Sequence, residues 1–237
     1  MPETRILVIE DDPTVRDVVR RYLERDGHTV LQAEDGPSGL AMARADKPDL
    51  IVLDVMLPGL SGLEVCSALR VTDNNTTPII MLTALGEEDD RISGLALGAD
   101  DYVTKPFSVK ELALRVQSVL RRASGPATND GHVGVVTDGD LTINTVSRTV
   151  HLGGRIVALT IREFDLLQFF LTHRGEVFSR TDLLKRVWGW NFGDHSTVTV
   201  HIKRLRYKIE TTPATPTRIA TVYGLGYRYD GMEGTAS

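Results

Sequence analysis

The sequence predicts an α/β fold, in which a doubly wound sheet of five parallel strands is followed by a smaller α+β domain. In residues 1–122, short apolar runs alternate with amphipathic helical patterns, which is typical of parallel strands buried between helices. After residue 139, short strand patterns instead flank three helical patterns. The stretch between them is rich in Gly, Ser, Pro and Asn and is predicted to be flexible. We therefore expect a first domain at 1–122, a linker at 123–138 and a second domain at 139–233.

Five strands and five helices alternate in the first domain. The strands are predicted at Ile6–Ile9, Thr29–Ala33, Leu50–Leu53, Ile79–Leu82 and Tyr102–Thr104. The helices are predicted at Pro13–Asp26, Pro37–Ala45, Leu63–Val71, Asp89–Leu97 and Val109–Arg122. Strict alternation of this kind favours a parallel sheet with helices on both faces.

The second domain is predicted to be a winged helix-turn-helix. Its first strands are expected at Leu141–Asn144, Thr149–Leu152 and Arg155–Ala158, the last two joined by a Gly-Gly turn. Thr160 and Glu163 form a capping box that opens the first helix, and Ser179 caps the second. A third helix is expected from about Ser196 to Glu210, and Thr221–Tyr229 forms a closing hairpin with a glycine-bearing turn. Three helices followed by a hairpin define the winged architecture.

Composition indicates a protein without membrane spans or disulfides. Of 237 residues, 41% are hydrophobic and 25% are charged, and no apolar run approaches the roughly 20 residues that a membrane helix needs. The start of the chain lacks the apolar region of a signal peptide. The single cysteine, Cys66, lies in a helical apolar pattern and is expected to be a core residue. These features predict a cytoplasmic protein.

Charge is distributed unevenly between the two domains. Residues 1–122 contain 14 Lys and Arg against 21 Asp and Glu, a net charge of −7. From Asp140 to the end, 13 Lys and Arg stand against 9 Asp and Glu, a net charge of +4. An acidic first domain and a basic second domain suggest that only the second meets a polyanion such as DNA.

Polar side chains follow the predicted strands of the first domain. Glu10 and Asp11, Asp54, Thr83 and Lys105 each come directly after an apolar run. In an open α/β sheet, ligand sites form outside the carboxyl ends of the strands. Mg²⁺ prefers oxygen ligands and takes one or two carboxylates together with water and phosphate. We therefore expect a magnesium and phosphoryl site in which Asp11 and Asp54 are ligands and Glu10 acts through water.

The same residues suit phosphoryl transfer to a carboxylate. Asp54 is placed to attack phosphorus and form an aspartyl phosphate. Lys105 would neutralise charge on the phosphoryl oxygens, and Thr83 would donate a hydrogen bond to them. The Lys105–Pro106 bond is a candidate cis peptide, since cis bonds occur mainly before proline.

These motifs resemble the receiver domain of two-component response regulators. The resemblance rests on Glu10-Asp11, Asp54–Gly59, Thr83-Ala84 and Tyr102–Phe107, and it covers essentially residues 5–122. It implies that Asp54 accepts a phosphoryl group from a sensor histidine kinase. It further implies that Asp11, Asp54 and the Met56 carbonyl bind Mg²⁺, with Glu10 in the outer shell. Thr83 and Tyr102 would form a switch pair, and Lys105 would bind phosphate.

The resemblance also implies a dimer. In the OmpR/PhoB-type subfamily, the fourth helix, fifth strand and fifth helix form a symmetric interface held by salt bridges. The charged residues of this face are Arg91, Asp100, Asp101, Glu111, Arg115 and Arg122. By resemblance, Arg91 is expected to pair with Glu111, and Asp101 with Arg115, across the two-fold axis after phosphorylation. Exposed ion pairs are individually weak, so they would set register more than affinity.

The third helix of the second domain is predicted to read DNA. Val198, Ile202, Leu205 and Ile209 form one buried stripe. The opposite side is predicted to carry Thr197, Val200, His201 and Arg204, flanked by Lys203 and Lys208, with Arg206 nearby. Arginine can bind guanine bidentately in the major groove, and Val200 could touch a thymine methyl group.

Residues 140–230 resemble the winged-helix effector domain of the same subfamily. The ending Thr221–Tyr229 is a recognisable wing, but members commonly have arginine at the position of Tyr223. Tyrosine cannot supply that charge in the minor groove, although its hydroxyl could contact phosphate or sugar. The loop Gly189–His195 corresponds to the region that touches RNA polymerase in relatives. Trp190 and Phe192 either anchor that contact or pack inward.

A phosphohydrolase is the alternative function class for a chain with these residues. An aspartate-nucleophile phosphohydrolase of the haloacid-dehalogenase type needs a second acid two residues after the nucleophile, and Met56 stands there. The methionine at this position favours a transcription regulator that accepts a phosphoryl group and binds promoter DNA, rather than an enzyme. DNA binding that does not depend on phosphorylation is the remaining variant.

Overall fold

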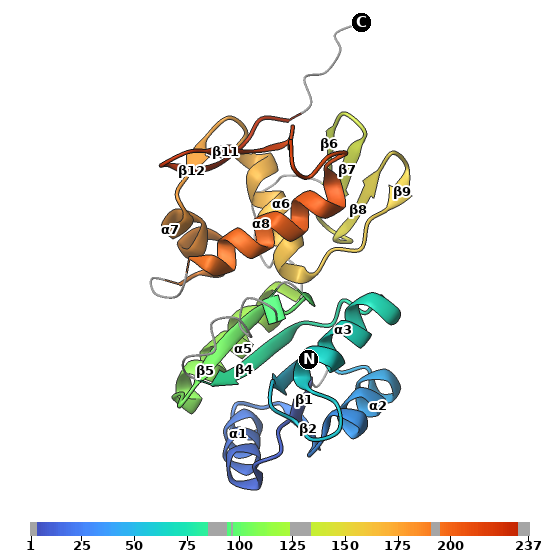
Figure 1. Ribbon diagram of the computed structural model, residues 1–237, viewed down its shortest axis with the longest axis vertical. Coiled ribbons are helices and arrows are strands. Elements are labelled where there is room, and N and C mark those ends of the chain that lie inside the picture. Colours follow the sequence, from blue (N-terminus) through green and yellow to red (C-terminus); the bar gives the residue numbers. More distant parts are fainter. Residues whose placement is uncertain (1–3, 85–93, 96, 124–133, 191–194, 232–237) are drawn as a thin grey trace, which may run out of the picture. The chain divides into compact units, whose positions relative to one another are not determined.

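The computed structural model describes residues 4–84, 94–95, 97–123, 134–190 and 195–231. The chain divides into two compact units, residues 1–123 and 124–237, which are shown in Figure 1. The first unit contains one sheet and the second contains two, and each unit has its own apolar core, so each is described by itself. None of the helices in these ranges combines the length and the apolar character that a membrane crossing requires.

The first unit contains the predicted five-stranded parallel sheet. Its strand order is β2-β1-β3-β4-β5, and all four strand pairs are parallel. The strands are β1 (Arg5–Ile9), β2 (Thr29–Ala33), β3 (Leu50–Asp54), β4 (Ile79–Ala84) and β5 (Asp101–Lys105). The helices are α1 (Pro13–Arg25), α2 (Gly36–Asp46), α3 (Gly62–Ser67), which continues as the π-helical η1 (Ala68–Thr72), and α5 (Val109–Ala123). The helix predicted at Asp89–Leu97 falls mostly outside the described residues.

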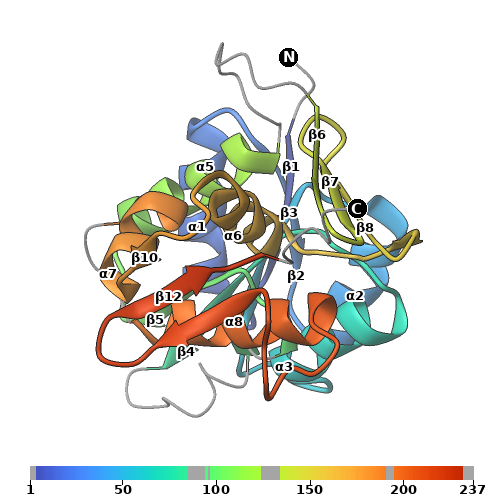
Figure 2. The same ribbon diagram turned by 90° about the horizontal axis from the view of Figure 1, so that it is seen from above.

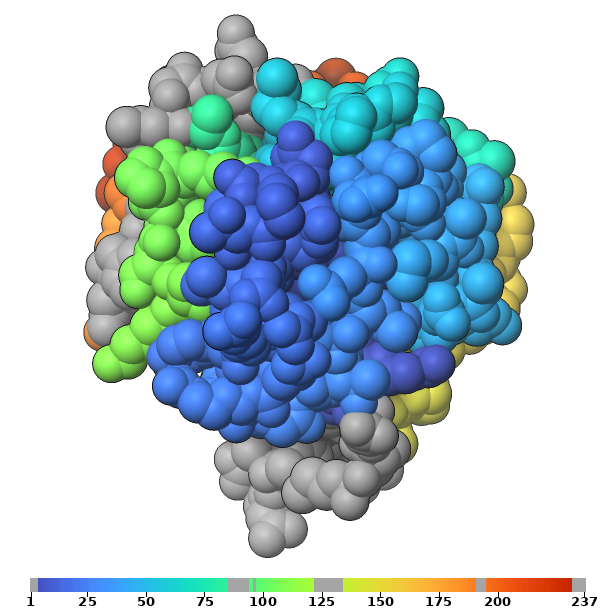
Figure 3. Space-filling model, turned by 90° about the horizontal axis from the view of Figure 1, so that it is seen from below, coloured from blue at the N-terminus to red at the C-terminus, as the bar shows by residue number. Residues whose placement is uncertain are grey.

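The strands form because their apolar runs are buried on both faces. Every residue of β3 is buried, which explains why its sequence is continuously apolar up to Asp54. On one face, Val19 and Leu23 of α1 and Val116 of α5 join the core. Helices α1 and α5 are neighbours, and the blue and green surfaces in Figure 3 show them side by side.

Short polar side chains fix where the helices begin. The Asp12 carboxylate accepts hydrogen bonds from the backbone N–H of Thr14 (2.7 Å) and Val15 (3.2 Å), and therefore caps α1. At α3, Ser61 and Glu64 form a reciprocal capping box. These caps set the position at which the chain leaves each strand end and enters the next helix.

The second unit has the predicted winged helix-turn-helix architecture, seen from above in Figure 2. An antiparallel sheet contains β6 (Val135–Asp138), β7 (Leu141–Asn144), β8 (Thr149–Leu152) and β9 (Arg155–Ile156). The helices are α6 (Ile161–Thr172), α7 (Arg180–Leu183) with the π-helical η2 (Leu184–Trp188), and α8 (Ser196–Ile209). A second sheet joins β10 (Val177–Phe178), β12 (Gly226–Tyr229) and β11 (Ile219–Val222).

Two strands of this unit were not anticipated. Val135–Asp138, the last four residues of the predicted linker, form β6, which pairs with β7. The Asp138 carboxylate accepts a hydrogen bond from the buried Tyr229 hydroxyl (2.7 Å) and forms an ion pair with Arg174 (3.1 Å). These contacts hold β6 on the domain. The two-residue β10 pairs with β12, so the wing is part of a three-stranded sheet rather than an isolated hairpin.

The backbone also requires glycine at Gly226. Its φ is +149°, and a Cβ there would lie 2.0 Å from the carbonyl oxygen of Phe178. The close approach allows β12 to pair with β10 at the start of α7. The wing is thereby attached to the helix-turn-helix.

Candidate functional site

The carboxyl ends of β1, β3, β4 and β5 bring the predicted pocket residues together. Asp54 is the last residue of β3, and Thr83 and Lys105 lie at the ends of β4 and β5. Glu10 follows β1, and its backbone N–H binds the carbonyl oxygen of Ala33 (3.1 Å). Behind Asp54, Gly62 is needed because a Cβ there would lie 2.0 Å from the Asp54 carbonyl oxygen. The strand topology thus gathers residues that are far apart in the sequence.

Lys105 is the central contact of the pocket. Its Nζ lies 2.8 Å from Asp54 Oδ2 and 2.9 Å from Glu10 Oε2. Both carboxylates are buried, whereas the lysine side chain remains partly exposed. The Lys105–Pro106 peptide bond is cis, as the sequence suggested. An ammonium group held between two buried carboxylates supplies a positive charge directly at the reactive oxygen.

Burial and neighbouring charges shift the pKa values of Glu10 and Lys105. Burial raises the pKa of Glu10 to about 7, and the nearby Asp54 charge adds to this shift while Lys105 opposes it. Burial alone would lower the pKa of Lys105, but its hydrogen bonds to Asp54 and Glu10 outweigh burial and raise it. The lysine therefore stays protonated at neutral pH, and Glu10 is poised to gain or lose a proton.

The oxygen donors in the pocket suit a divalent cation. One carboxylate oxygen from each of Glu10, Asp11 and Asp54 lies within 4.8 Å of the others. Asp11 is exposed, so its side chain can reach an ion from the solvent side. Three converging carboxylates with no soft ligand match the preference of Mg²⁺. The Met56 backbone N–H lies 3.4 Å from Asp54 Oδ1, which places the Met56 peptide next to the same carboxylate.

An arginine that the sequence interpretation missed supports this donor set. Arg16 Nη1 donates to the carbonyl oxygens of Glu10 (2.5 Å) and Asp11 (3.2 Å). It thereby fixes the backbone from which both carboxylates project. In the sequence, Arg16 follows Asp11 by five residues and lies in the predicted helix. Helical spacing alone does not distinguish it from an ordinary surface residue. Asp12 faces the helix instead and caps α1.

The predicted switch residues occupy neighbouring strands. Thr83 is buried at the end of β4, opposite Thr104 in the strand register. Tyr102 is half-buried on β5 and pairs with Met81. Thr83 therefore lies on the strand next to that of Asp54, and Tyr102 lies on the strand beyond it.

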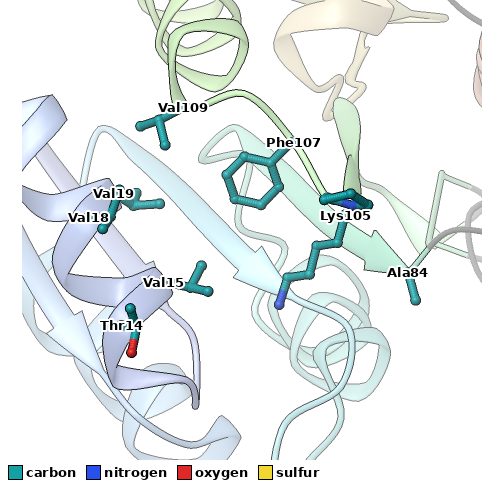
Figure 4. A pocket seen from close by; sticks show the side chains of 9 residues that line it. Thr14, Val15, Val18, Val19, Ala84, Lys105, Phe107 and Val109 are labelled. Atoms are coloured by element: carbon teal, nitrogen blue, oxygen red, sulfur yellow. The ribbon is translucent and has the colours of Figure 1, made fainter.

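An apolar groove opens beside the pocket. It has a volume of about 490 Å³ and is formed by α1 and by the segment that connects β5 to α5. Figure 4 shows Val15 and Val19 of α1 pointing toward Phe107, with Lys105 at one end. Val18, at the same face, is 44% exposed.

The charged residues predicted at the dimer face are engaged within the chain. Asp100, Asp101 and Arg115 are buried, so their predicted exposure is wrong. Asp100 accepts hydrogen bonds from Arg70 Nη2 (3.1 Å) and from the Ile79 N–H (3.0 Å). Arg115 binds Asp101 (3.1 Å) and Glu111 (2.7 Å) of the same chain. Arg91 and the Arg122 side chain lie outside the described residues. Pairing across a two-fold axis stays a prediction, and it requires Arg115 to exchange partners.

The predicted DNA-reading face of α8 is corrected by the structure. Val198, Ile202, Leu205 and Ile209 form the buried stripe as predicted. However, Thr197, Val200 and His201 are also buried, and so they cannot be the exposed face. The ring of His201 packs edge-on against Trp188, and its Nδ1 lies 2.8 Å from the Thr197 carbonyl oxygen. Helix α8 is packed on two sides, so the buried arc is wider than its apolar stripe.

Two of the basic residues that were predicted to contact DNA stabilise the fold instead. Arg204 and Lys208 bind the buried carboxylate of Glu163 at 2.8 Å and 2.7 Å. Although burial alone would raise the pKa of Glu163, the charges of Arg204 and Lys208 lower it. Glu163 also caps α6 through the N–H of Thr160 (2.9 Å). One carboxylate therefore joins the start of α6 to the end of α8, and Arg204 is not aimed at a base.

The exposed face of α8 carries Thr199, Lys203 and Tyr207. Arg206, at the edge of this face, donates to the Ile219 carbonyl oxygen (2.6 Å) and to Thr221 Oγ1 (2.8 Å) of β11. Arg180 of α7 donates to Thr199 Oγ1 (3.2 Å). Thr199 and Arg180 were not predicted as site residues. Helical phase could have identified Thr199, because it lies about 60° beyond the edge of the apolar stripe.

The structure decides the orientation of Trp190 and shows the exposure of Tyr223. Trp190 packs into the core of the domain, whereas Tyr223 at the wing tip is 92% exposed. Phe192 lies outside the described residues. The inward alternative is therefore correct for Trp190.

Comparisons with known proteins agree with both halves. Residues 6–117 match the family described as response regulator receiver domain, and residues 154–229 match transcriptional regulatory protein, C terminal. The chain is 41% identical to sensory transduction protein RegX3 of Mycolicibacterium smegmatis, covering 96% of this chain and 100% of that one. It is 44% identical to the alkaline phosphatase synthesis transcriptional regulatory protein PhoP of Bacillus subtilis, covering 95% and 96%.

Solved structures give the same result at the level of whole chains. The Thermotoga maritima response regulator DrrB, an OmpR/PhoB homolog, is 34% identical over 97% of this chain and 100% of that one, with a TM-score of 0.50. A RitR mutant is 27% identical over 95% and 98%, with a TM-score of 0.74. A receiver fold, a winged helix and relatives that match along nearly their whole length lead to one assignment. The chain belongs to the two-component response regulators of the OmpR/PhoB type, which carry a receiver domain and a DNA-binding domain.

Proposed function

We propose that this protein accepts a phosphoryl group on Asp54 from a sensor histidine kinase and then regulates transcription from promoter DNA. The observation that carries the proposal is the contact of Lys105 Nζ with the buried Asp54 carboxylate at 2.8 Å, beside a convergent set of acids. A carboxylate at a strand end with a fixed ammonium group is placed for attack on phosphorus. We expect this reaction in the cytoplasm, where promoters are found.

Each residue of the pocket has a separate role in the phosphoryl transfer. An oxygen of Asp54 forms a bond to phosphorus while the phosphorus–nitrogen bond of the donor phosphohistidine breaks and the imidazole leaves. Lys105, which remains protonated, faces the negative charge of the incoming oxygens. The hydroxyl group of Thr83, at the end of β4, donates a hydrogen bond to one of them. Glu10, Asp11, Asp54 and the Met56 carbonyl would hold Mg²⁺, which neutralises phosphoryl charge when it is bound.

Chemical labelling tests the acceptor residue. Full-length protein incubated with a phosphohistidine donor and Mg²⁺ should acquire one hydroxylamine-labile phosphate, and Asp54→Ala should acquire none. Asp54→Asn serves as the matched control, because it keeps the size of the side chain and removes its nucleophilic charge. Labelling that persists at another residue in both variants would contradict the assignment.

The kinase is expected to dock in the apolar groove between α1 and the β5–α5 segment. The donor histidine must come within bonding distance of Asp54, and this groove opens next to Lys105. Val18→Asp should therefore slow phosphorylation by the kinase by at least about tenfold, the effect of 1.4 kcal/mol. Phosphorylation by acetyl phosphate, which needs no protein contact, should be unchanged. Equal slowing with both donors would show a damaged pocket instead of a lost docking site.

Phosphorylation is expected to act through Thr83, Tyr102 and the α5 face. Thr83 would move toward the phosphoryl group and Tyr102 would turn inward, which biases the surface that contains Asp101, Glu111 and Arg115. We propose that this surface then forms a symmetric homodimer, which binds paired half-sites and contacts RNA polymerase. Sedimentation of the protein with and without the donor measures the first of these steps.

Selection of genomic fragments tests the whole proposal. Purified protein should enrich fragments with paired half-sites about one helical turn apart, and recovery should improve with donor and Mg²⁺. Equal recovery in both states would retain DNA binding and remove phosphorylation of Asp54 as the switch. Lack of enrichment in either state would contradict the DNA-binding function.

A further inference from the structure

We propose that the apolar groove beside Lys105 binds the leaving group of a small phosphoryl donor, and that acyl phosphates with a hydrocarbon tail therefore phosphorylate Asp54 directly. The activity rests on the phosphorylation of Asp54 proposed above and names a class of substrate for the same pocket. The length of the tail sets the rate, because the methyl group of acetyl phosphate is too short to fill the groove. The reaction needs no kinase.

The groove has the size and the lining of a site for an apolar small molecule. Its volume of about 490 Å³ lies within the range of about 300–1,000 Å³ that is usual for ligand pockets. Thr14 and Lys105 are the polar residues among those that line it. The other lining residues are apolar and include Val15 and Val18 of α1 and Phe107 after β5. A hydrocarbon tail placed here leaves water, which favours binding in proportion to the apolar area that is buried.

The groove begins where the phosphoryl group would lie. Lys105 lines the groove, and its Nζ is 2.8 Å from Asp54 Oδ2. Ala84, which follows Thr83 and pairs with Lys105 in the strand register, lines the groove too. In Figure 4 the Lys105 side chain extends between Val15 and Ala84. A phosphoryl group bound at Asp54 and Lys105 therefore has the groove directly beside it, and the substituent of that group can enter the groove.

A second hollow beside the pocket is unsuitable for this leaving group. It has a volume of about 450 Å³ and shares Asp11 with the pocket, and its lining also includes Glu34 and Asp35. An acyl phosphate releases a carboxylate, which the acidic side chains of this hollow repel. None of the described residues that line the apolar groove is acidic. Charge and the burial of the tail therefore both direct the leaving group into the apolar groove.

The reaction is one phosphoryl transfer, with a leaving group different from that of the kinase. An oxygen of Asp54 forms a bond to phosphorus, and the bond between phosphorus and the acyl oxygen breaks. The electron pair of the broken bond leaves with the carboxylate, so the products are aspartyl phosphate and a free carboxylate anion. An in-line displacement points this leaving group away from Asp54. No proton, oxidant or further reactant is required.

Donors that differ only in the tail test the proposal. Full-length protein with Mg²⁺ is incubated with acetyl phosphate or with hexanoyl phosphate, which break the same type of bond. The second-order rate constant for hydroxylamine-labile phosphate on Asp54 should be at least about tenfold larger for hexanoyl phosphate, the effect of about two buried methylene groups. Intact mass separates phosphoryl transfer from acyl transfer to the protein.

Matched variants assign the rate difference to the groove. Val18 is 44% exposed, so its replacement leaves the core intact. Val18→Asn and Val18→Asp should both reduce the ratio of the hexanoyl to the acetyl rate constant at least about threefold, the effect of about one buried methylene group. The acetyl phosphate rate of each variant is the internal reference. Val71, on η1, is 75% exposed and does not line the groove, so Val71→Asp should keep the ratio of the wild type.

Three results would overturn the proposal. Equal rate constants for the two donors in the wild type would show that the groove does not bind the tail, while labelling of Asp54 by acetyl phosphate or phosphohistidine would leave the proposed function standing. A ratio that persists in both Val18 variants, or that falls equally in Val71→Asp, would place the tail outside the groove. Absence of label from every donor, phosphohistidine included, would overturn the proposed function together with this activity.

Discussion

Glu10 shows how strongly the fold controls the chemistry of a single residue. Its carboxyl group is buried between Asp54 and Lys105, and its backbone is held by Arg16. Burial raises its pKa to about 7, so the carboxyl group gains or loses its proton in the neutral range of pH. A divalent cation favours the carboxylate form, and therefore cation and proton compete at this residue.

Magnesium binding should consequently depend on pH. Below pH 7 the cation must displace the Glu10 proton, and above pH 7 the carboxylate is already free of it. We expect Mg²⁺ affinity to rise as pH increases from 6 to 8, with release of up to one proton per ion at the lower pH. Calorimetric titration in two buffers with different heats of ionisation measures the proton release.

Glu10→Gln provides the control for this effect. The amide cannot ionise, so the pH dependence over this range should flatten. A dependence that remained as steep as in the wild type would place the titrating group elsewhere.

The pocket residues were predictable from the sequence, but their supporting contacts were not. In a parallel sheet the ends of successive strands share one edge, so Asp54, Thr83 and Lys105 had to meet once the strands were identified. Arg16 acts through two carbonyl oxygens, and carbonyl positions cannot be read from residue types. The burial of Asp100 depends on Arg70, which comes from a π-helical segment that periodicity does not reveal.

At the scale of elements, helix α8 has a packing part, which is buried or paired within the domain, and an exposed part that we propose reads DNA. Its length and apolar stripe were predicted correctly, whereas its exposed face was not. Periodicity locates the centre of a buried stripe, but its width depends on the neighbouring elements. Here Trp188 covers His201, and Glu163 of α6 holds Arg204 and Lys208.

Substitutions on these two parts should have opposite effects. Arg204→Ala leaves the buried Glu163 with one cation, so we expect a loss of roughly 1–3 kcal/mol in the free energy of unfolding. Lys203→Ala removes an exposed side chain, so stability should change by less than about 0.5 kcal/mol. Urea unfolding compares the two variants.

DNA binding should show the reverse pattern. Lys203→Ala should weaken binding and reduce the salt slope by about 0.9 if it contacts one phosphate. Arg204→Ala should keep the base preference of the wild type under conditions in which it remains folded. A selective loss of discrimination at one base pair in Arg204→Ala, with stability unchanged, would return that residue to the DNA interface.

At the scale of the whole molecule, the division into two domains was predictable from composition and charge, but the extent of the second domain was not. Gly, Ser and Pro between residues 123 and 134 indicate a linker. Val135–Asp138 has too short an apolar pattern to be identified as a strand, and it becomes one by pairing with β7. Its attachment depends on Asp138, whose partners Arg174 and Tyr229 are distant in the sequence.

The structural start of the second domain can be tested with fragments. A fragment of residues 134–237 retains β6, whereas a fragment of residues 140–237 lacks it and leaves the Tyr229 hydroxyl without Asp138. Burial, together with the hydrogen bond to Asp138, raises the pKa of Tyr229, so the hydroxyl remains a donor that needs an acceptor. We expect the shorter fragment to be less stable by roughly 2–4 kcal/mol in urea unfolding.

Asp138→Asn in the longer fragment is the matched control. It keeps β6 and removes the charge that binds Arg174, so its stability should fall between those of the two fragments. Equal stability of all three proteins would show that the domain begins after β6.

The separation of buried and exposed residues in α8 has a consequence for how such regulators diversify. Thr199, Lys203 and Tyr207 project from a helix that is held in place by other side chains of the same element. We expect replacement of Thr199 or Tyr207 to change the operator that is preferred and to leave the scaffold intact. After gene duplication, a copy of this chain can therefore acquire new target promoters through a few surface substitutions, without first having to recover a lost fold.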